Sequence, residues 1–238
     1  MYSFESRVRY SEVDENGLLS IIGIMNYLQD CSTFQSEHIG RGIRWLQEHD
    51  RAWLVTGWKI SILRRPELTE KIRLSTRPYQ YRGILGLRYF DIRSADTNEL
   101  LVGADSAWCY TQPSTGKPVR ITPEDIDPYL PVDEMPEGCG MKNRKIAVPD
   151  SGTPLAPFVI QRTHLDTNHH VNNAQYVEMA RDCLPEGFSY SGIQVQYLAQ
   201  AHLGDTVVPV LYREENRMTV SLGDGSGTVY AIVAFSER

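Results

Sequence analysis

The stretch His164-Leu-Asp-Thr-Asn-His-His-Val-Asn-Asn-Ala-Gln-Tyr176 is the part of the chain from which the rest can be interpreted. It contains three of the six histidines, one carboxylate and three asparagines. Asp166, Asn168 and His170 alternate with other residues, so an extended or turning backbone would place their side chains on one side. We therefore expect these three polar side chains to form one site.

A helix is predicted directly after this polar cluster. Asn172 or Asn173 can cap its first turn, and Pro185 ends it. The first turn of a helix carries unbonded backbone N–H groups and the positive end of the helix dipole. We expect the N–H groups of Val171, Asn172 and Asn173 to stabilise a developing oxyanion. The apolar face of this helix comprises Ala174, Val177, Ala180 and Leu184.

The two halves of the chain repeat each other. Asp14-Glu-Asn16 matches Asp166-Thr-Asn168 at an offset of 152 residues. The pattern from Leu63 to Ile72 matches the one from Leu198 to Val207 at an offset of 135 residues. Self-similarity at half the chain length indicates a duplicated structural unit.

Each unit combines a helix with a series of strands, which predicts an α+β fold with the sheet wrapped around the helix. An acidic, proline-rich segment at 121–150 is expected to link a domain at 1–120 to a domain at 151–238. In the first domain we predict a helix over 20–40 and strands near 4–10, 53–63, 71–74, 86–89 and 101–110. In the second we predict strands near 158–163, 192–198, 206–213, 218–222 and 228–235.

The pattern Asp166-x-Asn168-x-His170-Val171-Asn172-Asn173-x-x-Tyr176 resembles the signature of acyl-ACP thioesterases, the plant plastid enzymes and their bacterial relatives. A looser form is shared by hotdog-fold thioesterases in general. The resemblance implies a tandem (double) hotdog in which each half is an antiparallel sheet wrapped around a long helix. It also implies that the N-terminal half holds the acyl chain. Since Leu18 occupies the position of His170, we expect the second half to be catalytic.

Hydrolysis of a thioester requires an activated water and a stabilised oxyanion. His170 supplies an imidazole, the side chain best suited to take a proton near neutral pH. Asp166 can orient that imidazole or take the proton itself, and Asn168 can hold the water or the thioester carbonyl. In the plant enzymes that this motif resembles, a Glu followed by a Cys completes the site. Here Gln200 and Ala201 occupy those two positions, so a nucleophilic Cys is ruled out and Gln200 can orient a water but not act as a base.

The composition limits the function classes. A net charge of −6 argues against a nucleic-acid-binding protein. No apolar run approaches membrane-spanning length, and the start of the chain lacks the pattern of a signal peptide. The four cysteines show no metal-binding spacing, so we expect reduced thiols in a cytoplasmic protein that needs no cofactor or metal. A zinc site remains an alternative by residue type, from His164, Asp166, His169 and His170.

Residues 57–93 carry a net charge of +6, against −12 for the remainder. This segment is either a solvated sheet face or a docking patch for an acidic partner. Acyl carrier protein is strongly acidic, so it is the partner that the resemblance implies. The residues predicted to bind it are Arg64, Arg65, Lys71 and Arg73, with Arg77 on the same strand face.

The resemblance thus predicts hydrolysis of fatty acyl-ACP to fatty acid and carrier protein. An acyl-CoA thioesterase is the alternative within the same class, and a hotdog dehydratase is a more distant one. A hotdog protein that binds acyl groups without turnover is the alternative outside it, because Gln200 replaces the acidic residue. A homodimer is compatible with the sequence, and the acyl chain-length preference cannot be derived from it.

Overall fold

The computed structural model describes residues 1–129, 140–141, 144–166 and 169–237. It divides into two compact units, Met1–Lys142 and Asn143–Arg238. Part of the predicted linker at 121–150 is helical, because α3 (Pro123–Ile126) and the 3-10 turn η2 (Asp127–Tyr129) belong to the first unit. The rest of that segment falls partly on residues 130–139 and 142–143, which lie outside the described residues.

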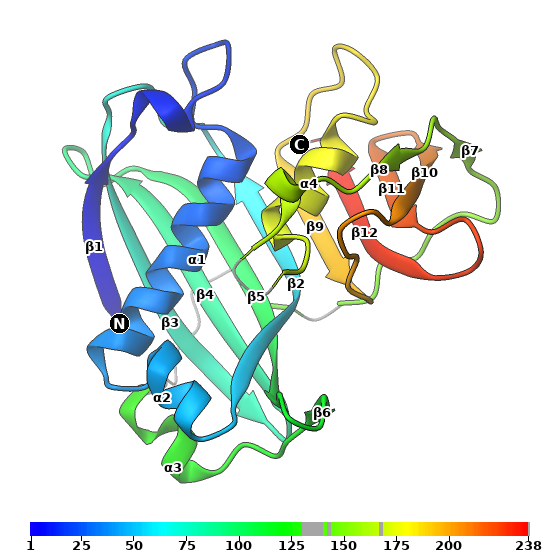
Figure 1. Cartoon of the computed structure of the whole chain (residues 1–238). Coiled ribbons are helices and arrows are strands. Elements are labelled where there is room, and N and C mark those ends of the chain that lie inside the picture. The colour runs from blue at the N-terminus through cyan, green and yellow to red at the C-terminus, as the bar shows by residue number, and fades with distance from the viewer. Residues whose placement is uncertain (130–139, 142–143, 167–168, 238) are drawn as a thin grey trace. The chain divides into compact units, whose positions relative to one another are not determined.

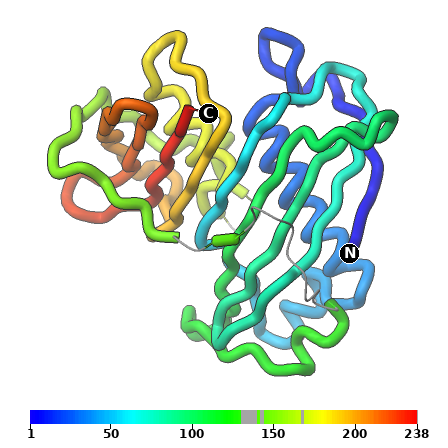
Figure 2. The backbone as a smooth tube through the Cα atoms, turned by 180° about the vertical axis from the view of Figure 1, so that it is seen from behind, coloured from blue at the N-terminus to red at the C-terminus, as the bar shows by residue number. Residues whose placement is uncertain are grey.

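The first unit is an antiparallel sheet with one long helix, α1 (Ile21–His38), against it (Figure 1). The strands follow the spatial order β1-β3-β4-β5-β2, and β6 pairs with β5. Figure 2 shows the long strands of this unit side by side, seen from behind. Their bounds are β1 (Tyr2–Arg7), β2 (Ala52–Ile62), β3 (Lys71–Arg82), β4 (Leu85–Ser94), β5 (Leu100–Gln112) and β6 (Lys117–Pro118); η1 (Tyr10–Glu12) and α2 (Ile43–Glu48) complete the unit.

Helix α1 begins where the sequence predicted, because Ser20 caps it. The Ser20 hydroxyl accepts a hydrogen bond from the Gly23 N–H at 3.0 Å, which satisfies one of the free donors of the first turn. The side chains of Ile21, Ile24 and Leu28 are buried, and α1 packs against β1 and β3. The helix thus fills the inner side of the sheet.

The second unit repeats the plan with a shorter helix, α4 (Asn173–Arg181), against β11 and β12. Its strands follow the order β9-β12-β11-β10-β7, and β8 pairs with β10. Their bounds are β7 (Thr153–Pro154), β8 (Phe158–Val159), β9 (Gly192–Tyr197), β10 (Thr206–Glu214), β11 (Arg217–Gly223) and β12 (Val229–Ser236). The α+β plan predicted for both halves is therefore confirmed.

The strands expected near 71–74 and 86–89 are longer than predicted, as β3 and β4, and three other elements are shorter. The strand expected at 4–10 ends at Arg7, and the chain then turns at η1. The strand expected at 158–163 ends at Val159, because the Ile160 N–H bonds to the turn at Asp205 and the 3-10 turn η3 (Arg162–His164) follows. The helix expected to reach Leu184 ends at Arg181. The N–H groups of Cys183 and Leu184 bond three residues back, which tightens the chain before Pro185.

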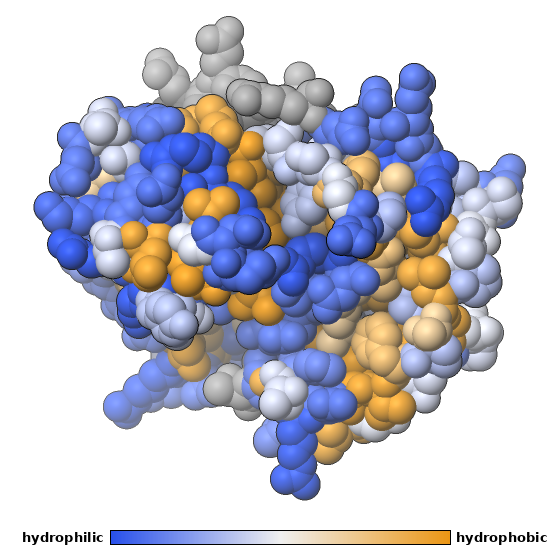
Figure 3. All heavy atoms as spheres, turned by 90° about the horizontal axis from the view of Figure 1, so that it is seen from above, coloured by the Kyte–Doolittle hydropathy of each residue, from blue (hydrophilic) through white to orange (hydrophobic). Residues whose placement is uncertain are grey.

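Apolar side chains form the interior of each unit, and some also reach the surface. Figure 3 shows hydrophobic residues in orange among hydrophilic ones in blue on one face of the molecule. Leu198, Leu203 and Ile43 are each about half exposed. Among the described residues, no helix is both long enough and apolar enough to cross a membrane.

Candidate active site

The predicted polar cluster forms a closed turn in the second unit. The Asp166 N–H donates to the His170 carbonyl at 2.8 Å, and the His170 N–H donates to Asp166 Oδ1 at 3.3 Å. The His169 N–H donates to the Asp166 carbonyl at 3.1 Å, with φ of 60° at His169. The bonds among Asp166, His169 and His170 therefore close a turn, in place of the extended chain that the sequence analysis also allowed. Asn168 lies outside the described residues.

The turn leads directly into α4, and the second of the two candidate caps is not used. Asn172 is the cap, because its Oδ1 accepts from the Ala174 N–H at 2.9 Å. The Val171 N–H donates to the Ala201 carbonyl at 3.2 Å, and the Asn172 N–H donates to the His164 carbonyl at 2.9 Å. These two amides are therefore committed to carbonyls, which corrects their prediction as oxyanion donors.

Two tyrosines, the buried Tyr176 and the partly buried Tyr197, attach the Gln200 segment to the start of α4. Tyr176, one turn into the helix, accepts a hydrogen bond from the Ala201 N–H at 2.9 Å. Tyr197 donates to the Asn173 carbonyl at 2.9 Å. Burial raises the pKa of Tyr176 to about 12, so its hydroxyl stays protonated at neutral pH. Both hydroxyls hold Gln200, which is exposed, near the turn. The sequence analysis quoted Tyr176 within the motif but gave these hydroxyls no role.

The first unit contains the same turn without the histidine. The Asp14 N–H donates to the Leu18 carbonyl at 2.9 Å, and the Leu18 N–H donates to Asp14 Oδ1 at 3.2 Å. The Leu19 N–H donates to the Pro66 carbonyl at 2.7 Å, as Val171 does to Ala201. Corresponding residues thus make corresponding bonds, which confirms the predicted duplication.

Arg65 occupies the place in the first unit that Gln200 has in the second. Its guanidinium pairs with Asp14, with Arg65 Nη2 2.6 Å from Asp14 Oδ2, and its Nε donates to the Leu19 carbonyl at 2.8 Å. Burial alone would raise the pKa of Asp14. The Arg65 guanidinium and the N–H groups of Asn16 and Leu18 outweigh it and hold that pKa below its ordinary value. Where the second unit has an amide, the first has an ion pair.

Most of the chain matches one protein family, in two parts. Residues 1–129 match the model of the acyl-ACP thioesterase N-terminal domain, and residues 152–228 match that of the C-terminal domain. The chain belongs to the acyl-ACP thioesterase family. It is 23% identical over 189 residues to the chloroplastic acyl-[acyl-carrier-protein] hydrolase FATB1 of Cuphea viscosissima, covering 75% of this chain and 45% of that protein. The chain therefore spans about half the length of this curated relative.

Solved structures establish the fold. A putative oleoyl thioesterase from Lactobacillus plantarum matches with a TM-score of 0.83 and 25% identity, covering 100% of this chain and 96% of that one. A 1,4-dihydroxy-2-naphthoyl-CoA thioesterase from Synechocystis matches with a TM-score of 0.51 and 11% identity, covering 56% of this chain and 98% of that one. A structure with a single unit thus matches about half of the chain. The predicted double hotdog is confirmed.

The basic residues of this acyl-ACP thioesterase family member have partners within the first unit. Arg64 binds Glu70 at 2.9 Å and Glu99 at 3.2 Å. Lys71 lies 3.5 Å from Asp96, and Arg73 donates to the neutral amide of Asn98. The charges of Arg64 and Arg65 are therefore compensated locally, and Arg73 keeps more of its own.

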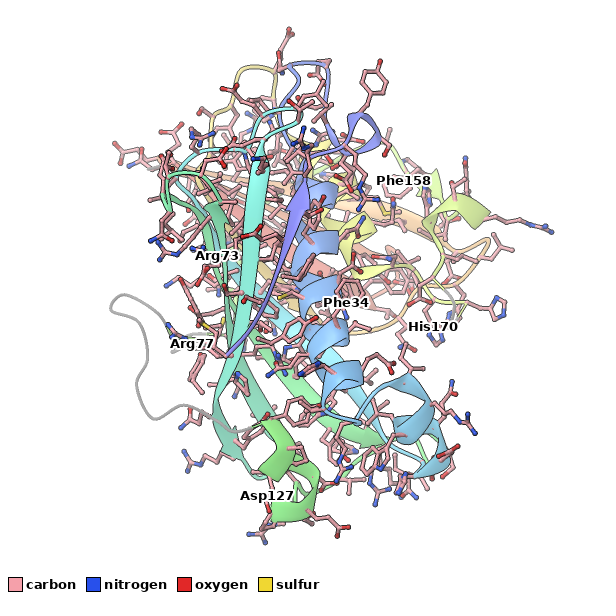
Figure 4. All side chains as sticks on the ribbon, turned by 90° about the vertical axis from the view of Figure 1, so that its left-hand side faces the viewer. Phe34, Arg73, Arg77, Asp127, Phe158 and His170 are labelled. Carbon is pink, nitrogen blue, oxygen red and sulfur yellow. The ribbon has the colours of Figure 1, made fainter. Side chains whose placement is uncertain are left out.

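Strand β3 presents its basic residues on one face, as predicted. Ile72 and Leu74 are buried, whereas Lys71 is exposed and Arg73 and Arg77 are half-buried. Figure 4 shows Arg73 and Arg77 on the side of β3 away from α1.

Arg88 does not belong to this basic surface. The basic residues of 57–93 therefore do not all lie on an exposed sheet face, as the sequence had suggested. It is 8% exposed, bonds to Gln35 of α1 and Thr76 of β3, and lies over the rings of Phe90 and Tyr129.

In the described part of the chain, the cysteines and the potential metal ligands form no metal-binding or thiol-based site. No group of three His, Cys, Asp or Glu side chains there is arranged to hold a metal ion. Cys31, Cys109 and Cys183 are free thiols. Burial raises the pKa of Cys183 to about 11, and its thiol donates to the Met179 carbonyl at 3.2 Å, so it packs against the last turn of α4 as a protonated thiol.

Proposed function

We propose that this protein hydrolyses the thioester of fatty acyl-acyl-carrier-protein to a free fatty acid and carrier protein. The observation that carries the proposal is the closed Asp166–His170 turn at the start of α4, joined through Val171 to the segment of Gln200 and Ala201. Membership of the acyl-ACP thioesterase family supports this substrate class. Its similarity to the acyl-[acyl-carrier-protein] hydrolase FATB1 of Cuphea viscosissima supports it as well.

In the proposed reaction, His170 accepts a proton from a water as the water oxygen attacks the thioester carbonyl carbon. The tetrahedral intermediate then loses its C–S bond, and the proton passes to the thiolate that leaves. Asp166 fixes His170 through the backbone, because its Oδ1 accepts the His170 N–H. Asp166 remains the alternative proton acceptor.

Gln200 and Asn173 are assigned to the remaining tasks. The amide of Gln200 orients the attacking water, since an amide cannot take its proton. The Asn173 N–H, at the first position of α4, is the oxyanion donor that remains after Val171 and Asn172 are excluded. Asn168, as the motif implies, holds the water or the thioester carbonyl. None of these steps requires a metal or an organic cofactor.

The N-terminal unit, in this proposal, holds the acyl chain and binds the acidic carrier protein. Lys71 and Arg73 are its best docking residues, because both lie on the outer face of β3, where Lys71 is exposed and Arg73 donates to the neutral amide of Asn98. Arg64 and Arg65 are engaged with carboxylates of their own unit. We place the reaction in the cytosol, consistent with the free thiols.

The test is to incubate the purified protein with acyl-ACPs of several chain lengths and to detect the released thiol with Ellman's reagent. Matching acyl-CoAs measure the selectivity for the carrier. We expect His170→Ala and Asp166→Asn each to lower turnover at least about a hundredfold. Retained activity in His170→Ala would refute its role as the base. Acyl binding without thiol release in the wild type would instead indicate a binding protein.

A further inference from the structure

The ring of His170 lies against a second histidine that the catalytic motif does not contain. The ring centroids of His170 and His202 are 5.2 Å apart, with an interplanar angle of 76°. This is the edge-to-face arrangement that aromatic rings prefer. His202 comes two residues after Gln200, on the segment that Tyr176 holds through Ala201. The contact therefore joins the proposed base to the Gln200 segment.

The backbone of His202 is fixed by a short turn. The His202 N–H donates to Asp205 Oδ2 at 2.8 Å, and the Asp205 N–H donates to the His202 carbonyl at 3.1 Å. The same carboxylate lies 3.7 Å from His202 Nδ1, so it also faces the ring. The His202 side chain is 60% exposed, and it is held from the side of Asp205 rather than by burial.

The ring of His170 has fewer constraints than its backbone. Its N–H and carbonyl are both bonded to Asp166. Within the described part of the chain, neither of its ring nitrogens has a hydrogen-bond partner. Among the described residues, the His170 ring contacts one other aromatic ring, that of His202. A general base must hold its nitrogen within hydrogen-bond reach of the water, so free rotation of this ring would lower the rate.

The first unit shows the same backbone without the ring pair. Leu18 and Glu67, at the positions of His170 and His202, form an isolated antiparallel bridge. Glu67 and Glu70 make the turn that His202 and Asp205 make in the second unit: the Glu67 N–H donates to Glu70 Oε2 at 2.9 Å. The turn at Glu67–Glu70 thus recurs at His202–Asp205, and the bond from the Leu19 N–H to the Pro66 carbonyl recurs between Val171 and Ala201. Both members of the pair are histidine only in the unit with the proposed base.

We infer that His202 is a positioning residue for His170, whose ring it holds in the orientation that water activation requires. This inference rests on the proposed function. His202 acts through His170 and takes no proton itself. An edge-to-face ring pair of this kind corresponds to about a two- to tenfold effect on a rate that depends on it.

The experiment measures kcat and KM for acyl-ACP in His202→Ala, His202→Phe and Glu67→Ala. We expect His202→Ala to lower kcat about two- to tenfold with KM unchanged, because the base is misoriented and the substrate is not contacted. His202→Phe keeps an aromatic ring against His170 and should recover most of the loss. Glu67→Ala removes the exposed side chain at the matched position of the first unit and should match the wild type.

A second readout does not depend on activity. In protein with labelled histidine, nuclear Overhauser contacts between the rings of His170 and His202 should be present in the wild type. The His170 ring signals should broaden or shift in His202→Ala and keep their wild-type positions in Glu67→Ala. A wild type that shows the ring contact but releases no thiol would refute the proposed hydrolysis, whereas a wild type that releases thiol without the ring contact would refute the positioning alone.

Three outcomes overturn the inference. One is wild-type kcat in His202→Ala. Another is a loss in His202→Phe as large as that in His202→Ala, which would mean that the aromatic ring is not what matters. The third is an increase in KM alone, which would mean that His202 contacts the acyl-ACP substrate.

Discussion

Arg65→Ala should destabilise the first unit and leave the proposed active site unaltered. The guanidinium of Arg65 binds the Asp14 carboxylate at 2.6 Å, the Leu18 carbonyl at 3.0 Å and the Leu19 carbonyl at 2.8 Å. The side chains of Arg65 and Asp14 are 23% and 8% exposed. Removal of the arginine would leave a nearly buried carboxylate without its counter-ion and two carbonyls without a donor.

The loss of unfolding free energy in Arg65→Ala should lie between two limits known for ion pairs. Exposed ion pairs contribute about 0–1 kcal/mol, and removal of one partner from a fully buried pair costs about 3–5 kcal/mol. Since only Asp14 is close to fully buried, we expect Arg65→Ala to lower the free energy of unfolding by about 2–3 kcal/mol. For a chain of this size that corresponds to a fall in Tm of about 4–12 °C. Arg44→Ala is the control, because the Arg44–Glu48 pair is 88% and 55% exposed and should contribute less than about 1 kcal/mol.

Tryptophan fluorescence during urea unfolding is a suitable assay. All four tryptophans lie in the first unit, at positions 45, 53, 58 and 108, so the signal follows the unit that is changed. An unfolding free energy of Arg65→Ala within about 0.5 kcal/mol of the wild type would refute the reasoning. Arg65 would then again be a candidate for binding the carrier protein.

The same comparison has a defined dependence on pH. A folded-state pKa of Asp14 below its ordinary value of 3.8 means that the stabilisation is fully present above that value. It is lost as the pH falls through the lower folded pKa. The difference between wild type and Arg65→Ala should therefore be largest near neutral pH and should shrink below about pH 3.8. A difference that grows in acid would contradict the ion pair.

Two further predictions concern the rest of the first unit. Asn16→Ala should leave kcat for acyl-ACP within about twofold of the wild type, because it is the Asn16 backbone N–H that bonds to Asp14; a normal Tm with a collapse of kcat would contradict this. If Lys71 and Arg73 dock the acidic carrier, kcat/KM for acyl-ACP should fall as salt approaches ~0.15 M, where the Debye length is about 8 Å. Charge reversal at Lys71 should mimic that fall, while hydrolysis of a short neutral thioester stays constant; equal losses on both substrates would assign these residues to the fold.

The parts of the fold that depend on neighbouring residues could be predicted from the sequence. The start of α1 followed from the Ser20 cap and the apolar spacing behind it, and the duplication followed from the repeated Asp-x-Asn pattern. Strand β3 followed from its alternation, which also placed Lys71 and Arg73 on one face. In each case, the signal and the structure that it predicts lie within one turn or one strand.

The features that were missed depend on contacts between distant parts of the chain. Arg65 and Asp14 are 51 residues apart, so the sequence alone presented Arg65 as an exposed charge. Arg88 is buried because its strand neighbours bring it under α1. The prediction of a free N–H at Val171 failed, because Val171 precedes the Asn172 cap and its N–H bonds to the Ala201 carbonyl. Local rules give the available donors, and the tertiary pairing decides which of them are used.

The last prediction transfers the ion pair from one unit to the other. Gln200 has the place of Arg65, and Asp166 that of Asp14, in turns that both close with a bond from the aspartate N–H to the carbonyl four residues on and a return bond from that residue's N–H to the aspartate Oδ1. Gln200→Arg should therefore bring a guanidinium onto the Asp166 carboxylate and into the space assigned to the attacking water. We expect turnover to fall at least about a hundredfold, as for loss of the base, with no decrease in Tm.

The reciprocal variant Arg65→Gln serves as the control for this transfer. It should lower the stability of the first unit and retain wild-type kcat, since that unit has Leu18 in place of the histidine. Two opposite outcomes from one exchanged pair are hard to obtain from a general disturbance of the fold. Full activity in Gln200→Arg would mean that position 200 does not face Asp166, and the assignment of Gln200 to the water would fall with it.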